Sequence, residues 1–125
     1  MLTYKNNDPY IEGTSLYDLV KVCQTPFYVY SQQKIINQVN KTKEILGNNI
    51  FYSIKSNSNQ AILKLMNSLD IGADVVSVGE LKRALEAGFD PKKIIFEGVG
   101  KSEQDLLYAM PVSYTHLRAH ETWQD

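Results

Sequence analysis

The chain has 125 residues and a formal net charge of -1, with 13 basic and 14 acidic side chains. A balance this close to neutral gives no electrostatic reason to expect binding to nucleic acid or to an anionic membrane. No apolar run is long enough to span a bilayer, no signal-peptide pattern opens the chain and there is one cysteine, so we expect a cytoplasmic protein without a disulfide framework.

The first part of the chain predicts a polar, irregular stretch that ends near Gly13, followed by a helix that Thr14 or Ser15 caps. This helix carries one apolar stripe, formed by Leu16, Leu19, Val20 and Cys23. We therefore expect Cys23 to be a small core residue and not a nucleophile.

Lys55 follows directly on an apolar stretch at residues 51–54. A lysine at the end of a buried strand is costly because its charge must be desolvated. It can be a surface lysine whose stem is packed and whose ammonium group stays in water. Alternatively, it can form a Schiff base with a carbonyl compound, because burial lowers the pKa of the amine and frees it for attack. Asn57 and Asn59 add uncharged donors and acceptors, which suit a polar pocket.

Residues 59–69 predict a helix, with an apolar face formed by Ile62, Leu65, Met66 and Leu69. Lys55 thus lies where a strand passes into a helix. In parallel α/β folds this position is the carboxyl edge of the sheet, where active sites gather.

The same order of elements then repeats. Residues 72–77 predict a strand, residues 78–88 a helix that stops at Gly88, and residues 93–98 a third strand. Ser102 is expected to cap a further helix. Strands that alternate with helices at this spacing predict a parallel sheet, which can be either a closed barrel or an open sheet.

Four segments, at residues 25–31, 51–57, 72–81 and 98–102, together resemble the start of the diaminopimelate decarboxylases. These belong to the pyridoxal-phosphate decarboxylases with an alanine-racemase-like (β/α)8 barrel. The family's Lys-Ala-Asn is Lys55-Ser56-Asn57 here, and its Ser-Gly-Gly-Glu is Ser77-Val78-Gly79-Glu80. Val78 replaces a glycine with a β-branched residue in a strand-to-helix turn, which puts the geometry of that turn in question.

The resemblance implies that pyridoxal 5'-phosphate is bound covalently by Lys55. It also implies that Asp74 positions the cofactor, although an acid at this place can instead cap a neighbouring turn. Ser77 either bonds near the cofactor ring or closes its own turn. The implied reaction releases carbon dioxide from the small amino acid meso-diaminopimelate and forms L-lysine, in an intact enzyme that is a homodimer. The family's phosphate loop, pyridine-nitrogen glutamate and proton-donating cysteine are expected later in the chain or from a second subunit.

A barrel of this type needs about 250 residues. Residues 1–110 are therefore expected to be a partial pyridoxal-phosphate-binding barrel domain, truncated after about three barrel strands and of doubtful activity. Residues 111–125 resemble a translated sequencing adapter, which we interpret as an artefactual tail. His116 and His120 have the spacing of two metal ligands on a helix, but both lie in this tail, so we predict no metal site.

Other functions remain open. Gly100-Lys101-Ser102 follows a strand as a P-loop does, but Ile95 stands where that loop needs a glycine, which argues against nucleotide binding. Racemases usually continue Lys-Ala-Asn with Ala-Tyr-Gly, and Ser58-Asn59 disagrees with that pattern. Arginine, ornithine and carboxynorspermidine decarboxylases are not excluded, and neither is an inactive truncated product.

Overall fold

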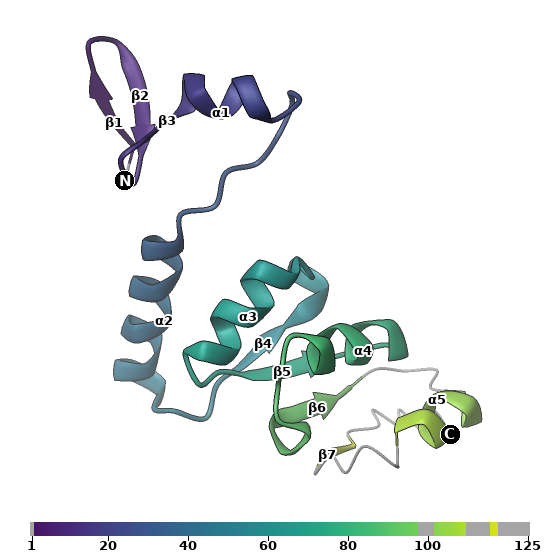
Figure 1. Cartoon of the computed structure of the whole chain (residues 1–125). Coiled ribbons are helices and arrows are strands. Elements are labelled where there is room, and N and C mark those ends of the chain that lie inside the picture. The colour runs from purple at the N-terminus through teal and green to yellow at the C-terminus, as the bar shows by residue number, and fades with distance from the viewer. Residues whose placement is uncertain (1, 98–101, 110–115, 118–125) are drawn as a thin grey trace, which may run out of the picture. The chain divides into compact units, whose positions relative to one another are not determined.

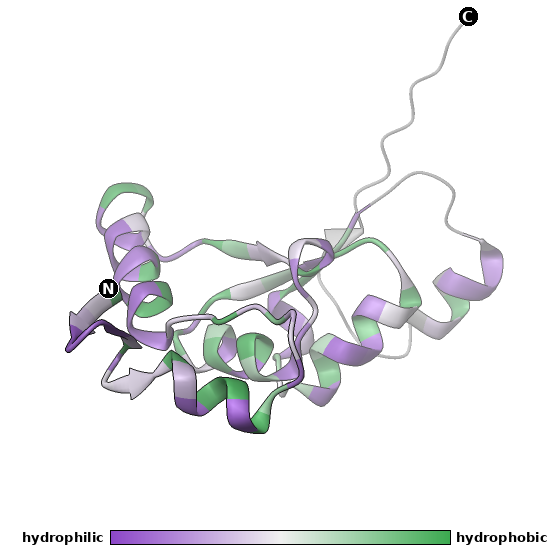
Figure 2. Ribbon diagram, turned by 90° about the horizontal axis from the view of Figure 1, so that it is seen from above, coloured by the Kyte–Doolittle hydropathy of each residue, from purple (hydrophilic) through white to green (hydrophobic). Residues whose placement is uncertain are grey.

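The computed structural model describes residues 2–97, 102–109 and 116–117 (Figure 1, Figure 2). The chain divides into two compact units, Met1–Ile45 and Leu46–Asp125, and each is considered by itself. No helix among the described residues combines the length and apolar character that a membrane crossing requires.

The first unit begins with a small antiparallel sheet in the order β1-β2-β3, formed by β1 (Leu2–Lys5), β2 (Asp8–Ile11) and β3 (Thr14–Ser15). Asn6 and Asn7 connect β1 to β2 with φ angles of 51° and 65°. Positive φ at both central residues is typical of a type I′ hairpin, and asparagine tolerates it better than most residues do. The expectation of an irregular N-terminal stretch is therefore wrong.

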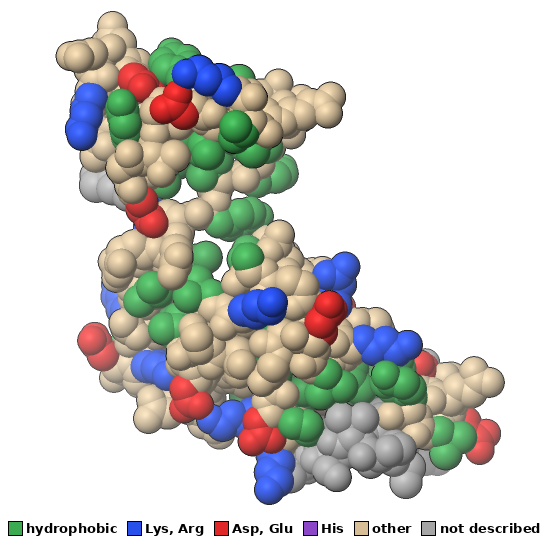
Figure 3. All heavy atoms as spheres, in the orientation of Figure 1, with side chains coloured by type: hydrophobic (Ala, Val, Ile, Leu, Met, Phe, Trp, Pro, Cys, Tyr) green, Lys and Arg blue, Asp and Glu red, His purple; other side chains and the backbone are tan. Residues whose placement is uncertain are grey.

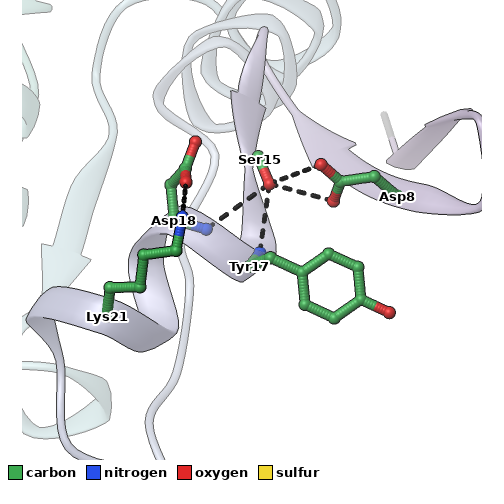
Figure 4. Close-up of polar contacts among 5 residues, drawn as sticks. All are labelled: Asp8, Ser15, Tyr17, Asp18 and Lys21. Atoms are coloured by element: carbon green, nitrogen blue, oxygen red, sulfur yellow. Dashed lines mark hydrogen bonds and ion pairs between the residues drawn. The ribbon is translucent and has the colours of Figure 1, made fainter.

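Ser15 ends this sheet and caps α1 (Leu16–Val22), which confirms one of the two predicted caps. Its Oγ accepts hydrogen bonds from the backbone N–H groups of Tyr17 at 3.1 Å and Asp18 at 3.4 Å. The same hydroxyl donates to the carboxylate of Asp8, whose Oδ2 lies 2.7 Å away (Figure 4). Ser15 is 5% exposed, and it joins β2 to the start of α1.

Hydrophobic side chains remain at the surface of this unit (Figure 3), among them Tyr4, Tyr17, Val20, Val22 and Tyr28. Cys23 is exposed as well, so the expectation that it is a core residue is wrong. Of the predicted apolar stripe of α1, Leu16 and Leu19 are half-buried, whereas Val20 is exposed like Cys23. However, the residues described in this unit bury none of the helix's side chains.

The second helix, α2 (Gln32–Leu46), was not predicted. The carboxylate of Glu12 lies at its start, where it accepts hydrogen bonds from the backbone N–H of Gln33 at 2.9 Å and from the Ser31 hydroxyl. Ser31 Oγ in turn accepts from the backbone N–H of Lys34 at 3.1 Å. The bonds from Ser31 and Gln33 hold the pKa of Glu12 below its ordinary value. The hairpin and the start of α2 are thereby tied together by one carboxylate.

The second unit contains four parallel strands in the order β4-β5-β6-β7. The strands alternate with helices along the chain: β4 (Phe51–Ser53), the 3₁₀ turn η1 (Ile54–Ser56), α3 (Gln60–Ser68), β5 (Gly72–Val75), α4 (Val78–Glu86), the 3₁₀ turn η2 (Pro91–Lys93), β6 (Ile94–Phe96), α5 (Glu103–Ala109) and β7 (His116–Leu117). This order confirms the predicted βα repeat and the predicted parallel sheet. Ser102 caps α5 as expected, because its Oγ accepts from the backbone N–H of Asp105 at 3.1 Å.

Strand β7 lies in the segment 111–125 that the sequence sets apart as a tail. Its two described residues pair with β6, with His116 opposite Ile95 and Leu117 opposite Phe96. His120 and the rest of that segment lie outside the described residues. Whether the segment is artefactual therefore stays a prediction.

One face of the sheet is buried beneath α3 and α4 (Figure 1). Its strands contribute Ala73, Val75, Ile94 and Phe96, all at most 1% exposed. The helices contribute Ile62, Leu63, Met66, Leu81 and Ala84 to the same core. Side chains alternate between the two faces of a strand, so the residues between these core positions lie on the opposite face. That second face contains the candidate site.

Candidate active site

The carboxyl ends of β4 and β5 bring the predicted site residues to one edge of the sheet. Ser53 ends β4 and lies opposite Asp74 in the register of the two strands. Lys55 follows two residues later in η1 and is exposed. The expected strand-to-helix position of Lys55 is confirmed, with a 3₁₀ turn in place of the last residues of the strand.

Two buried oxygen atoms lie on this edge without a hydrogen-bond partner. They are Ser53 Oγ and Asp74 Oδ1, which have no partner among the described residues. Because their residues are paired in neighbouring parallel strands, these side chains leave the same face of the sheet, with backbones about 5 Å apart. An unsatisfied buried polar group costs about 1–3 kcal/mol. The pair is therefore suited to a polar group that binds to both oxygens.

The turn that contains Lys55 is held by hydroxyl groups on both sides. Ser56 Oγ donates to the backbone oxygen of Ser53 at 2.7 Å, and Tyr52 Oη donates to the backbone oxygen of Asn57 at 3.1 Å. The two hydroxyl oxygens are 3.2 Å apart. These contacts fix the backbone before and after Lys55.

The next connection leads the chain from η1 into α3. The side-chain oxygen of Asn57 accepts from the backbone N–H of Asn59 at 3.0 Å. Asn59 in turn caps α3 by accepting from the backbone N–H of Ala61 at 2.9 Å. The two asparagines beside Lys55 therefore shape the chain here, whereas the sequence suggested that they line a polar pocket.

Ser77 caps α4 and accepts from the backbone N–H of Glu80 at 3.2 Å. Glu80 reaches back and accepts from the backbone N–H of Val76 at 2.9 Å, so two free N–H groups at the helix start are satisfied reciprocally. Val78 is the first residue of α4 and is not among the residues with positive φ, so the turn accommodates its β-branched side chain. The capping bond uses a lone pair of Ser77, whose hydrogen can still be donated to a ligand.

The P-loop-like pattern stays untested, because Gly100 and Lys101 lie outside the described residues. Within the described ranges, no three histidine, cysteine, aspartate or glutamate side chains are grouped so that they could hold a metal ion.

None of Ser53, Tyr52 and Ser56 was predicted from the sequence as a site residue. The strict alternation of β4 could have identified Ser53, because it places this residue on the face of Asp74 and away from Ile54, which is fully buried. The hydroxyls of Tyr52 and Ser56 donate hydrogen bonds to backbone oxygens. Every residue has a backbone oxygen, so the sequence does not indicate which one accepts. Among the described residues, the carboxyl ends of β4 and β5 carry one exposed primary amine, that of Lys55, and two buried oxygens without partners. This combination can bind a carbonyl compound covalently and orient it.

Residues 32–122 match the family model described as "Pyridoxal-dependent decarboxylase, pyridoxal binding domain". The chain is 38% identical over 110 residues to a diaminopimelate decarboxylase of Aquifex aeolicus, a match that covers 87% of the chain and 26% of that protein. It is 45% identical over 96 residues to one of Campylobacter jejuni, with 74% of the chain and 24% of that protein covered. The chain thus spans about a quarter of the length of these relatives.

Solved structures agree with the sequence matches. Diaminopimelate decarboxylase from M. jannaschii in co-complex with L-lysine aligns with a TM-score of 0.82 at 30% identity, over 90% of the chain and 28% of that protein. The Helicobacter pylori enzyme complexed with L-lysine aligns with a TM-score of 0.72 at 40% identity, over 78% of the chain and 25% of that protein. The similarity therefore extends across both the hairpin unit and the parallel strands.

Proposed function

Because the chain belongs to the pyridoxal-dependent decarboxylases and matches their pyridoxal-binding domain, we propose that Lys55 is the lysine that holds pyridoxal 5'-phosphate. The observation that carries this proposal is the edge formed by β4 and β5. There an exposed lysine follows a strand whose last residue is Ser53, and Ser53 Oγ and Asp74 Oδ1 are buried without partners.

The residues of this edge fit the cofactor. A primary amine is the group that condenses with an aldehyde, and Lys55 presents one to solvent. Asp74 can accept a hydrogen bond from a protonated group on the cofactor, and Ser53 beside it can donate or accept. Ser77 can add a donor at the start of α4. When bound, pyridoxal phosphate supplies the electron sink that stabilises the carbanion left after carbon dioxide is lost.

The residues of the chain have three tasks in this reaction. Lys55 would hold the cofactor, and its amine, when it is not bonded to the cofactor, could move a proton to or from the reacting carbon. Asp74 fixes the position of the cofactor, since its buried oxygen needs a donor. The helix caps made by Asn59 and Ser77 fix the backbone at the edge of the sheet, so that Lys55 and Asp74 stay oriented.

We propose meso-diaminopimelate as the substrate and L-lysine as the product of the whole protein. Support comes from relatives named diaminopimelate decarboxylase, which are 36% to 45% identical to the chain. An arginine decarboxylase of a Chlorella virus aligns with a TM-score of 0.68 at 25% identity, so arginine is the alternative substrate to test. We further propose that the intact enzyme is a cytoplasmic homodimer and that residues 1–125 alone are inactive, because the resemblance places the rest of the site elsewhere.

The assignment of Lys55 can be tested by chemical trapping. The complete product of the gene that encodes these residues is incubated with pyridoxal phosphate, reduced with borohydride and mapped by mass spectrometry. We expect the cofactor mass on Lys55, and we expect Lys55→Met to lose at least 90% of the trapped cofactor, because Lys55 is the only lysine among the described residues that directly follow β4 and β5. Lys64→Met, which removes an exposed lysine of α3, is the matched control and should trap normally.

Equal labelling of several lysines, or full trapping in Lys55→Met, would contradict the assignment. The substrate is tested separately by carbon dioxide release. Release from meso-diaminopimelate but not from L-arginine or L-ornithine is the expected result. Faster release from either of the other two amino acids would replace the proposed substrate while leaving the role of Lys55 intact.

A further inference from the structure

Lys55 stands at the centre of a three-residue turn, and its side chain is exposed. Packing therefore does little to fix its amine. The direction in which the side chain leaves the protein depends on the backbone of η1. The contacts that hold the η1 backbone therefore also determine the position of the Lys55 amine.

The hydroxyls of Tyr52 and Ser56 hold the η1 backbone on both sides of Lys55 in the sequence. Ser56 acts on the backbone oxygen of Ser53, two residues before Lys55, and Tyr52 acts on that of Asn57, two residues after it. Each hydroxyl has one hydrogen, and these two bonds use both. The two hydroxyl oxygens lie 3.2 Å apart, so the two hydrogen bonds are coupled to each other.

This pair of hydrogen bonds adjoins the core of the sheet. Tyr52 is half-buried and lies opposite Ala73, which is fully buried. Ile54, between Ser53 and Lys55, is also fully buried. One residue of the turn is thus packed in the core, while its neighbour Lys55 is held only through the backbone.

Ser56 occupies the place of the alanine in the Lys-Ala-Asn motif that the sequence resembles. Alanine has no hydroxyl and cannot bond the oxygen of Ser53. The bond is therefore an addition to the motif, made by the residue that differs from it.

We propose that Ser56 and Tyr52 are positioning residues, which hold the η1 turn in the shape that presents the amine of Lys55 to the cofactor aldehyde. This inference rests on the proposed function of Lys55. Neither hydroxyl touches the reacting atoms, and both act through the backbone that carries the lysine. Their loss lets the turn relax, so that part of the binding energy of the cofactor is spent on restoring its shape.

The test uses the complete gene product and measures the Kd of pyridoxal phosphate by absorbance, together with borohydride trapping on Lys55. Ser56→Ala and Tyr52→Phe each remove one hydroxyl, and each should raise the Kd about five-fold, the effect of one neutral hydrogen bond. Ser56→Thr keeps the hydroxyl and should stay within about two-fold of the wild type. Ser58→Ala is the matched control, because it removes a serine hydroxyl two residues further on that has no hydrogen bond to any described residue.

The double variant Ser56→Ala/Tyr52→Phe tests whether the two hydrogen bonds are coupled. Residues in contact show non-additive effects, so the combined rise should stay clearly below the roughly 25-fold product of the single effects. Rescue by threonine separates positioning by the hydroxyl from a general loss of stability, which the urea midpoint of each variant checks independently.

The proposal is overturned if Ser56→Ala and Tyr52→Phe bind the cofactor as tightly as Ser58→Ala does. It is also overturned if threonine at position 56 binds as weakly as alanine, or if the single effects multiply fully. In each of these cases trapping on Lys55 in the wild type still supports the proposed function. If the wild type is not trapped on Lys55, the proposed function and the positioning role fail together.

Discussion

At Gly72, the first residue of β5, the backbone lies directly against the ring of Phe51 on β4. A methyl group built on Gly72 would lie 2.4 Å from Phe51 Cδ1 and 2.8 Å from the backbone oxygen of Lys93. Neither distance is compatible with van der Waals contact, and the backbone oxygen cannot move aside as a flexible side chain can. Gly72 therefore allows β4 and the end of η2 to approach β5 closely, two residues before Asp74.

We expect Gly72→Ala to lower the free energy of unfolding by about 2–3 kcal/mol, because it overpacks the sheet. The measurement is urea unfolding of the complete gene product. Gly79→Ala is the control: a methyl group there would meet only Ser77 Oγ at 3.8 Å, and alanine favours the helix by up to about 1 kcal/mol. Equal stability of Gly72→Ala and the wild type would show that the close approach is not a constraint.

The elements of the second unit are those that the sequence predicts best. Regular apolar spacing identified α3 and α4, and Gly88, with a φ of 90°, ends the α4 segment as expected. The hairpin was missed although Leu2–Lys5 alternates between apolar and polar residues, because a strand of four residues is a short signal and its apolar residues are exposed. Similarly, α2 was missed, and none of its residues is buried.

The start of α2 depends on a charge. Since the pKa of Glu12 is lowered in the folded state, its cap contributes stability that is fully present above the ordinary carboxyl pKa of about 4.5 and is lost as the pH falls through the lowered value. We expect the unfolding free energy of the wild type to exceed that of Glu12→Gln at neutral pH. This difference should shrink as the solution is acidified below pH 4.5.

Urea unfolding at a series of pH values measures this difference. Glu44→Gln changes an exposed glutamate near the other end of α2 and serves as the control. A gap between wild type and Glu12→Gln that stays constant from neutral to acid pH would rule out a carboxylate cap.

For the molecule as a whole, burial is concentrated in one unit. All buried hydrophobic residues among those described lie between Ile54 and Phe96. In the described part of the chain, β4 pairs with β5 alone, so its other edge is open. An open edge and exposed apolar side chains both favour association with other chains.

We therefore expect residues 1–125, expressed alone, to be insoluble or poorly folded. The check is the yield of soluble monomer and its thermal unfolding, compared with those of the complete gene product. A soluble monomer that unfolds in one sharp cooperative transition would contradict this expectation.

The sequence identified candidate site residues but not the contacts that hold them. Lys55 was singled out from its residue type and its place at the end of a strand, and Asp74 from the resemblance to the decarboxylases, and their roles stay predictions. Cys23 shows the limit of this approach, since a periodic stripe identifies a face but not what covers it. The contacts that hold η1 end on backbone oxygens, and only the folded chain shows which oxygens they are.

The pairing of Ser53 with Asp74 has a consequence for how this sheet can evolve. Because side chains of a strand point alternately to its two sides, one residue inserted into β4 would turn Ser53 toward the helices and Tyr52 toward the face that contains the candidate site. Connections such as residues 87–90 can change length without this inversion. The length of β4 should therefore be conserved among descendants of this gene, even where most of its residues are substituted.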